Sequence, residues 1–501
     1  MSVLDKLREI RAVGGATLTS GLSDDVISRF AEQDPLLVQA VDEALAVFAE
    51  LKGDYGDMLN LDEEQQIQEI QGRFVNFYPD DAVNPYVTLA ARGPWIVTAK
   101  GAVLHDNGGY GMLGMGHAPE RVLEAMNRPH VMANIMTANF SQRRLVDALE
   151  REIGHARGGD CPFDRFLCMN SGSEAVTVAA RIADVNAKIA TDEGGPHAGK
   201  AIRRMALVGG FHGRTDRPAQ FSDSSRGTYQ KHLASFRDRD EDLVTVEVNN
   251  VEDLKARFAQ AEADGVFIEG LFIEPVMGEG NPGMAITPEF YQAARELTRE
   301  HGTLLLVDSI QAGLRATGCL SIVDYPGFEK LDGPDMESYS KALNAGQYPL
   351  SVLAMNERAA SLYRKGIYGN TMTANPRAMD VGVAVLESIS DELRANIRDR
   401  GQECVDKLEA LKTELAGKIT KVQGTGLLFS CELDSGEYKC YGAGSTEEYM
   451  RTRGLGVIHG GENSLRFTPH FDITSEEVDL MIEAVRDALE HGPRKEMRET
   501  G

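Results

Sequence analysis

The feature that most constrains this chain is an alternation of short apolar runs and helical patterns between residues 165 and 353. Stretches with helical periodicity, such as 174–190 and 288–301, lie between the apolar runs. This alternation predicts an α/β fold with a mostly parallel central sheet covered by helices, and a ligand beyond the carboxyl ends of the strands. The runs are 166–169, 205–208, 266–276, 304–307, 339–340 and 350–353.

The net charge narrows the range of partners. The 501 residues include 52 Lys and Arg against 77 Asp and Glu, a net charge of −25. Such a surface repels phosphate backbones and anionic membranes, so we expect neither nucleic acid nor membrane as a partner. No apolar stretch approaches the ~18 residues of a membrane span. The first ten residues lack the uninterrupted apolar run of a secretory signal, so we expect none there. Six scattered cysteines without a CxxC pair are typical of reduced thiols, which favours a cytoplasmic location.

The chain is expected to have four segments. Residues 1–80 carry 16 acidic and 6 basic residues, and the apolar residues between Val38 and Leu51 recur at helical spacing. We interpret this part as an accessory helical arm that covers a neighbouring subunit or surface. The closing helix is expected at 475–491, after strands near 426–432 and 465–467. The segments are an acidic helical extension (1–85), the N-terminal part of a small domain (86–145), a large domain (146–388) and a C-terminal small α+β domain (389–501).

Two glycine-rich patterns suggest nucleotide binding, and neither has the context that this function requires. Gly109–Gly114 satisfies GxGxxG, but no helix is expected to open there and no acidic residue follows at about 20 positions. Gly194–Ala201 resembles a P-loop, but it follows a helix and has Ala201 in place of the magnesium-binding hydroxyl. The eleven histidines include no HExxH and no compact Cys/His cluster, so we expect no metal site.

Two predicted strand ends carry groups suited to an anion and a planar ring. Asn170–Ala175 opens a helix with small hydroxyl residues and a glycine, which can bind a phosphate through free amides, although a plain helix cap uses the same residues. Gly209–Thr215 places Phe211 between glycines, where its ring can lie on a planar ligand, and adds Arg214 as a cation for a carboxylate.

Two further strand ends carry an acid and an amine. Asp308 leaves an apolar strand, where an unpaired carboxylate is costly to bury, so a cationic ring nitrogen is a suitable partner. Lys341 follows the run at 339–340, where desolvation can turn it into a carbonyl-trapping amine, although a surface lysine is the simpler interpretation of any one such residue. Together the four features match the needs of pyridoxal 5′-phosphate.

The chain resembles the class III pyridoxal-phosphate aminotransferases of the ornithine, GABA and lysine 6-aminotransferase type over about residues 86–490. Seven blocks occur in the family's order. The resemblance implies a fold-type I architecture, the cofactor pyridoxal 5′-phosphate, and a homodimer with active sites at the subunit interface. The blocks are 170–175, 211–215, 273–280, 308–313, 341–349, 369–376 and 465–469.

The resemblance also implies roles for individual residues. It makes Lys341 the Schiff-base lysine and proton shuttle, and Asp308 the partner of the ring nitrogen. It makes Arg214 and Arg466 the carboxylate-binding residues, with Glu279 as the acid that neutralises Arg466. A simpler interpretation is that Glu279 only caps a turn. The remaining cofactor-binding residues it implies are Ser171, Gly172, Ser173, Phe211, His212, Gln311 and, from the other subunit, Thr371.

The chain departs from the family pattern near the cofactor. The family usually reads Asp-Glu-(Val/Ile)-Gln-Thr-Gly, with Gly-Arg soon after, where this chain has Ser309, Ala312 and then Leu314-Arg-Ala316. Ala345 replaces a usual glycine. These changes leave the predicted catalytic residues in place, but they bear on substrate choice.

We therefore expect an aminotransferase that moves an amino group from an amino acid or ω-amino donor to a 2-oxo acid, 2-oxoglutarate being favoured, by ping-pong kinetics. One alternative is an isomerase, racemase or aminomutase of the same fold, which returns the amino group to its own substrate. A more distant alternative is a nicotinamide-dependent dehydrogenase that uses Gly109–Gly114.

Overall fold

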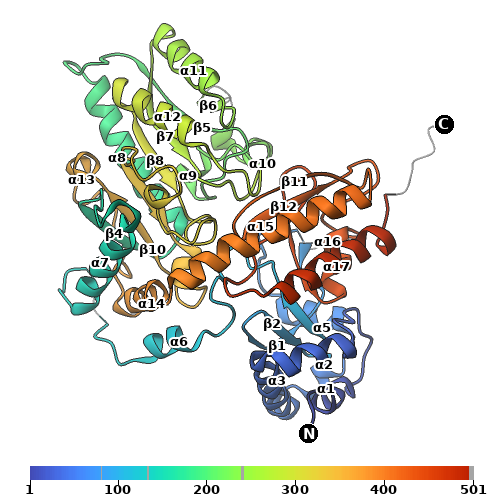
Figure 1. The fold of residues 1–501 in the computed structure, drawn as a ribbon. Helices are drawn as coiled ribbons and strands as arrows, with labels where there is room; N and C mark the ends of the chain where they lie inside the picture. The colour runs from blue at the N-terminus through green and yellow to red at the C-terminus, as the bar shows by residue number, and fades with distance from the viewer. Residues whose placement is uncertain (80–81, 133–134, 238–241, 496–501) are drawn as a thin grey trace. The chain divides into compact units, whose positions relative to one another are not determined.

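The computed structural model describes residues 1–79, 82–132, 135–237 and 242–495, which form two compact units (Figure 1). Unit 1 contains residues 1–119, 399–423 and the chain from 429 onward, and unit 2 contains residues 120–398 and 424–428. The boundary between them falls inside helix α15 (Asp391–Glu414) and strand β11 (Ile419–Thr425). Over the described residues we find no helix with both the length and the apolar character that a membrane crossing requires.

Unit 2 is built on a seven-stranded sheet with the order β4-β10-β9-β8-β7-β5-β6. All of its strands except β10 run in one direction, which confirms the expected mostly parallel sheet. Its strands are β4 (Arg165–Met169), β5 (Ala201–Leu207), β6 (Leu243–Val246), β7 (Val266–Ile273), β8 (Leu304–Asp308), β9 (Met336–Tyr339) and β10 (Ser351–Met355).

Strand β10 differs from a wholly parallel sheet because it pairs antiparallel with both β4 and β9. Only residues 340–350 join β9 to β10, and they form no long helix. A parallel connection requires a crossover of a dozen or more residues. The short connection therefore reverses the direction of the chain.

Helices cover the sheet of unit 2 on both faces (Figure 1). Every residue of β7 and β8 is buried, which explains why these strands are mainly apolar in the sequence, with Glu269 and Asp308 as the acidic exceptions. Leu304 and Leu306 belong to the core that α8 shares with β7, β9 and β10. The helices of unit 2 are α6 (Glu120–Asn127), α7 (Phe140–Glu152), α8 (Gly172–Thr191), α9 (Asp216–Ala219), α10 (Arg226–His232), α11 (Val251–Ala263), α12 (Pro288–Glu300), α13 (Glu357–Leu362) and α14 (Pro376–Leu386).

Unit 1 contains two four-stranded sheets, ordered β1-β2-β3-β13 and β11-β12-β15-β14. The closing helix α17 spans Ser475–His491, as expected from the sequence. The other strands are β1 (Thr88–Arg92), β2 (Trp95–Thr98), β3 (Val103–Asp106), β12 (Leu428–Leu433), β13 (Leu455–Gly456), β14 (Ile458–Gly460) and β15 (Ser464–Phe467). The other helices are α1 (Val3–Arg11), α2 (Asp24–Gln33), α3 (Pro35–Asp54), α4 (Gly56–Leu59), α5 (Glu63–Gln71) and α16 (Thr446–Thr452).

The N-terminal extension packs into unit 1 and shares its core. The helix expected between Val38 and Leu51 is α3, and its buried face joins Trp95 and Val97 in one apolar cluster. The buried Lys100 ammonium donates to the backbone carbonyls of Gly14, Leu59 and Leu61, at 2.5, 3.1 and 2.6 Å. The extension is therefore part of the folded unit as well as a candidate cover for other surfaces.

Candidate active site

The candidate site lies at the carboxyl edge of the sheet in unit 2. Strands β4, β5, β7, β8 and β9 run in the same direction, so the segments that follow them meet at this edge. They enclose a cavity of about 220 Å³. Its lining consists of Ser171, Gly172, Ser173, Phe211, His212, Gly213, Glu274, Asp308, Ile310, Gln311, Ser340 and Lys341.

One end of the cavity is the N-terminus of α8. Ser171 is the helix cap, and a capping box joins it to Glu174. One carboxylate oxygen of Glu174 accepts the amides of Asn170 and Ser171, at 2.9 and 3.0 Å. These bonds orient the Ser171–Ser173 turn, and the positive end of the helix dipole favours an anion there.

A buried acid, Glu274, holds the backbone of the segment that carries Phe211. Glu274 follows β7, and its two oxygens accept the amides of Phe211 and Gly278, at 2.9 and 3.0 Å. Burial raises the pKa of Glu274 to about 7, against the smaller opposing effect of the His212 imidazole. The sequence does not reveal this role, because the contact of Glu274 with Phe211 joins the ends of two different strands.

Asp308 ends β8 and is buried within a hydrogen-bond network. Its Oδ2 lies 2.9 Å from His212 Nδ1, and its Oδ1 accepts the Ser338 hydroxyl at 3.0 Å. His212 Nε2 is also buried, and no hydrogen bond to it is found among the described residues. This arrangement favours a proton on Nδ1 of His212 that is donated to the Asp308 carboxylate.

Lys341 follows β9 and opens a short 3-10 turn. Its φ of 46° lies in the left-handed region, which a side chain other than glycine rarely adopts and which is common at functional sites. Its amine lies 3.4 Å from Gln311 Oε1. The structure thus brings Lys341, Gln311, Asp308 and Phe211 to one cavity.

Arg214 and Glu279 form an ion pair in unit 2, with 3.8 Å between a guanidinium nitrogen of Arg214 and Oε1 of Glu279. The Arg214 guanidinium also lies over the Phe211 ring, 5.3 Å from its centroid. Arg466 belongs to β15 in unit 1, where its side chain is buried and lies 5.7 Å from the Tyr110 ring. Glu279 thus contacts Arg214, and its pairing with Arg466 stays a prediction.

Thr371 is exposed, and its segment lies beside the N-terminus of α8 in the same chain. The second oxygen of Glu174 accepts the Tyr368 hydroxyl and the Asn370 amide, at 2.7 and 2.8 Å. One carboxylate thus orders both the Ser171 turn and the segment that carries Thr371.

The structure supplies a physical reason for the serine at position 309, where the family has glutamate. Glu337, on the neighbouring strand β9, accepts the hydroxyls of Ser309 and Ser321, both at 2.5 Å, and the amide of Ile322 at 2.9 Å. The buried carboxylate near the end of β8 is therefore provided by β9. Ala345, another departure, has a φ of 52°, which explains why glycine is usual at this position.

The shape of the cavity fits pyridoxal phosphate. Gly213 has a φ of +115°, and a Cβ at this position would lie 2.4 Å from Ser173 Oγ. Only glycine therefore allows the segment that carries Phe211 to approach the N-terminus of α8 this closely. The cavity combines a helix N-terminus, an aromatic face, a buried carboxylate and an amine, which are the groups that the cofactor requires.

Comparison with known proteins identifies similar chains. A family model described as aminotransferase class-III matches residues 77–489. Ornithine aminotransferase 2 of Staphylococcus aureus is 30% identical over 410 residues, which cover 81% of this chain and 94% of that protein. A crystal structure of ornithine aminotransferase from Toxoplasma gondii, with partial occupancy of PLP at its active site, matches with a TM-score of 0.71 and 24% identity, over 87% of this chain and 97% of that one.

A solved structure with another activity has the same fold. A phospholyase from Arthrobacter in complex with phosphoethanolamine matches with a TM-score of 0.67 and 20% identity, over 86% of this chain and 99% of that one. At this identity the match indicates the fold only.

Proposed function

This chain belongs to the class III aminotransferase family, and from that premise we propose that it moves an amino group from an ω-amino donor to 2-oxoglutarate in two ping-pong half-reactions. The chain is a pyridoxal-phosphate-dependent transaminase. When bound, the cofactor supplies an aldehyde that takes up the amino group and a ring that accepts electrons. The choice of donor follows the relatives, which are named ornithine aminotransferases.

The observation that carries the proposal is the convergence of the Lys341 amine and the Asp308 carboxylate on one cavity. Lys341 would hold the cofactor and then move a proton between the donor carbon and the cofactor. Asp308, oriented by His212 and Ser338, would keep a proton on the ring nitrogen. Gln311 would donate to the ring oxygen, and Phe211 would stack on the ring.

The N-terminus of α8 supports phosphate binding by Ser171, Gly172 and Ser173. The Glu174 carboxylate accepts the amides of Asn170 and Ser171, so we expect the phosphate to contact the amides of Gly172 and Ser173. The Glu174 carboxylate points toward the backbone of the preceding turn and toward Asn370, and it therefore orders this turn.

We propose a homodimer in which Thr371 reaches the phosphate of the partner subunit. The argument is a set of exposed apolar residues, at Met372 next to Thr371 and in the segment that leads into α7 and includes its first residue, which a second copy of the chain would cover. Its members are exposed by half or more in the single chain: Val131, Met132, Ile135, Met136, Phe140 and Met372. We also propose a cytoplasmic location, in keeping with six cysteines that form no disulfide.

Arg214 and Glu279 support a dicarboxylic acceptor. A donor without a second carboxylate leaves Arg214 beside Glu279, and a dicarboxylate can displace Glu279 through paired N–H donors. Glu279→Gln should weaken the half-reaction with an ω-amino donor more than that with glutamate, and Arg214→Ala should weaken mainly the glutamate half-reaction. Arg214→Lys, which keeps the charge, is the matched control. Equal losses in both half-reactions would remove the acceptor assignment.

The deciding experiment is a panel of amine donors assayed with and without 2-oxoglutarate. Without the acceptor, we expect an ornithine-type donor to give at most one equivalent of product per bound cofactor; with it, product should accumulate over many turnovers together with an equal amount of glutamate. Many turnovers without any acceptor would support the alternative in which an isomerase, racemase or aminomutase returns the amino group to its own substrate. Turnover that requires a nicotinamide would support the dehydrogenase alternative.

A further inference from the structure

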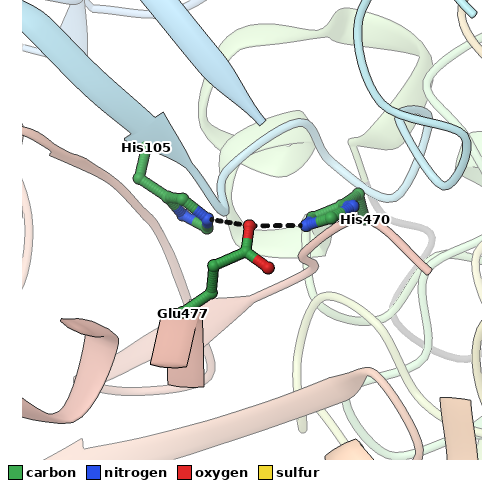
Figure 2. Close-up of side chains that lie close together, drawn as sticks. All are labelled: His105, His470 and Glu477. Carbon is green, nitrogen blue, oxygen red and sulfur yellow. Dashed lines mark hydrogen bonds and ion pairs between the residues drawn. The ribbon is translucent and has the colours of Figure 1, made fainter. Parts of the chain in front are cut away.

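Three side chains from distant parts of the sequence meet inside unit 1 (Figure 2). They are His105 of β3, His470 in the segment before α17, and Glu477 in the first turn of α17. The Glu477 Oε1 atom lies 2.9 Å from His105 Nε2 and 3.0 Å from His470 Nε2. One nitrogen from each imidazole and one carboxylate oxygen thus lie within 4.8 Å of one another.

The cluster is held in place by bonds outside it. The Glu477 Oε2 atom accepts the Thr474 amide at 2.7 Å, as part of the capping box of α17. The His105 ring is fully buried and packs edge-on against Trp95, with 5.0 Å between the ring centroids. Because each group is already oriented, a ligand would require little rearrangement.

The three side chains offer two imidazole nitrogens and one carboxylate oxygen at mutual distances that one ion can span. Imidazole and carboxylate together form a common ligand set for Zn²⁺ and similar ions, with water at a fourth position.

Asn107 provides an independent observation. Its side chain is fully buried, and its Nδ2 lies 2.9 Å from His105 Nδ1, while its Oδ1 is buried without a hydrogen-bond partner among the described residues. A half-turn of this amide would bring Oδ1 to Nδ1, provided that Nδ1 carries the proton. The lone pair of His105 Nε2 would then face Glu477 Oε1, an arrangement that either a metal ion between the two atoms or a second ring proton would satisfy.

We propose that His105, His470 and Glu477 bind one divalent transition-metal ion of the zinc type, with Asn107 as the outer partner that accepts the Nδ1 proton of His105. Metal-bound histidines generally donate their other ring N–H to such a partner. The fourth position would open on the side of His470, whose side chain is 13% exposed. None of these residues belongs to the set proposed to hold the cofactor. Because His105 lies on β3 and Glu477 on α17, the bound metal would link these two elements.

The test uses the cofactor-loaded protein, stripped with a chelator and dialysed against increasing Zn²⁺, with bound zinc counted per chain. Co²⁺ in place of Zn²⁺ gives visible absorption bands that report imidazole ligands. We expect one ion per chain, and a loss of affinity of about tenfold or more in His470→Asn. The matched control is His459→Asn, because His459 also pairs with a carboxylate, Glu447 at 3.0 Å, outside the cluster. It should bind as the unchanged protein does.

A pair of variants at Asn107 distinguishes a cluster that binds a metal ion from one held together by protons alone. Asn107→Ala leaves all three ligands in place and should lower the affinity about 10- to 100-fold, whereas Asn107→Asp, which keeps an acceptor, should retain binding. This pair also serves if His470→Asn does not fold. Absence of bound metal would overturn the proposal, as would an ion that His470→Asn retains at full affinity, and the cluster would then be held by protons alone.

Discussion

Replacing Glu337 by glutamine should stabilise the protein at alkaline pH and much less at acid pH. Burial raises the pKa of this carboxyl from 4.5 to about 7 in the folded chain. A carboxyl whose pKa is raised on folding binds a proton more tightly in the folded state, so it favours folding less as the pH rises from 4.5 to 7. Glutamine does not titrate, so the variant does not lose stability in this way as the pH rises.

The size of the effect follows from the two pKa values. The destabilisation caused by Glu337 grows by about 2.5 kcal/mol between about pH 5 and about pH 8. Glutamine can keep the contacts, because its Oε1 can accept from Ser309 and Ile322 while its amide donates to the hydroxyl of Ser321. The free energy of unfolding of Glu337→Gln, relative to the unchanged protein, should therefore increase by that amount over this range.

Denaturant unfolding followed by circular dichroism at the two pH values measures this difference. The tryptophan signal is unsuitable, because the single tryptophan, Trp95, lies in unit 1 whereas Glu337 lies in unit 2. Glu300→Gln, at an exposed position, is the control and should show the same small change at both pH values. A difference for Glu337→Gln that does not change with pH would refute the argument that burial raises this pKa.

Three predictions concern the cofactor site directly. Lys341→Ala should abolish turnover, and borohydride reduction of the unchanged protein should label Lys341 in a peptide map; a label on another lysine would contradict the assignment. Asp308→Asn should lower the rate of a single half-reaction about a thousandfold, or about 4 kcal/mol, while leaving the fold intact, and near-normal rates would show that the charge is not needed. Gly213→Ala should weaken cofactor binding about tenfold or more, because its methyl group would meet Ser173 at a φ that alanine adopts with strain. Fluorescence titration of the apoprotein with pyridoxal phosphate measures this, and unchanged affinity would show that the cavity can relax.

Much of unit 2 could be predicted because its inner strands are buried on both faces. Strands such as β8, which is apolar from Leu304 to Val307, then stand out in the sequence. The direction of β10 could not be predicted in this way, since an apolar run has no direction, and only the short connection after β9 determines it. Strand β6 was missed because it is short and half of its residues are only partly buried.

The candidate site could be located in part, since its residues directly follow the strands. The partnerships within it were not visible. Glu274 reaches Phe211, and Glu337 reaches Ser309, only because their strands are neighbours in the sheet. The three-residue cluster of unit 1 was likewise missed, because His105 and Glu477 are 372 positions apart.

The hydrogen bonds of Lys100 show that the start of the family match and the start of the folded unit lie at different positions in the chain. The match to the family begins at residue 77, so a gene shortened to that point would keep every family motif. The protein made from it would lack the three carbonyls that bind the Lys100 ammonium and the helices that cover Trp95. A charge would be left in an apolar surface newly open to water, which favours aggregation. For this chain, the family match begins at residue 77, whereas the apolar core around Trp95 already includes residues of the first helix, α1.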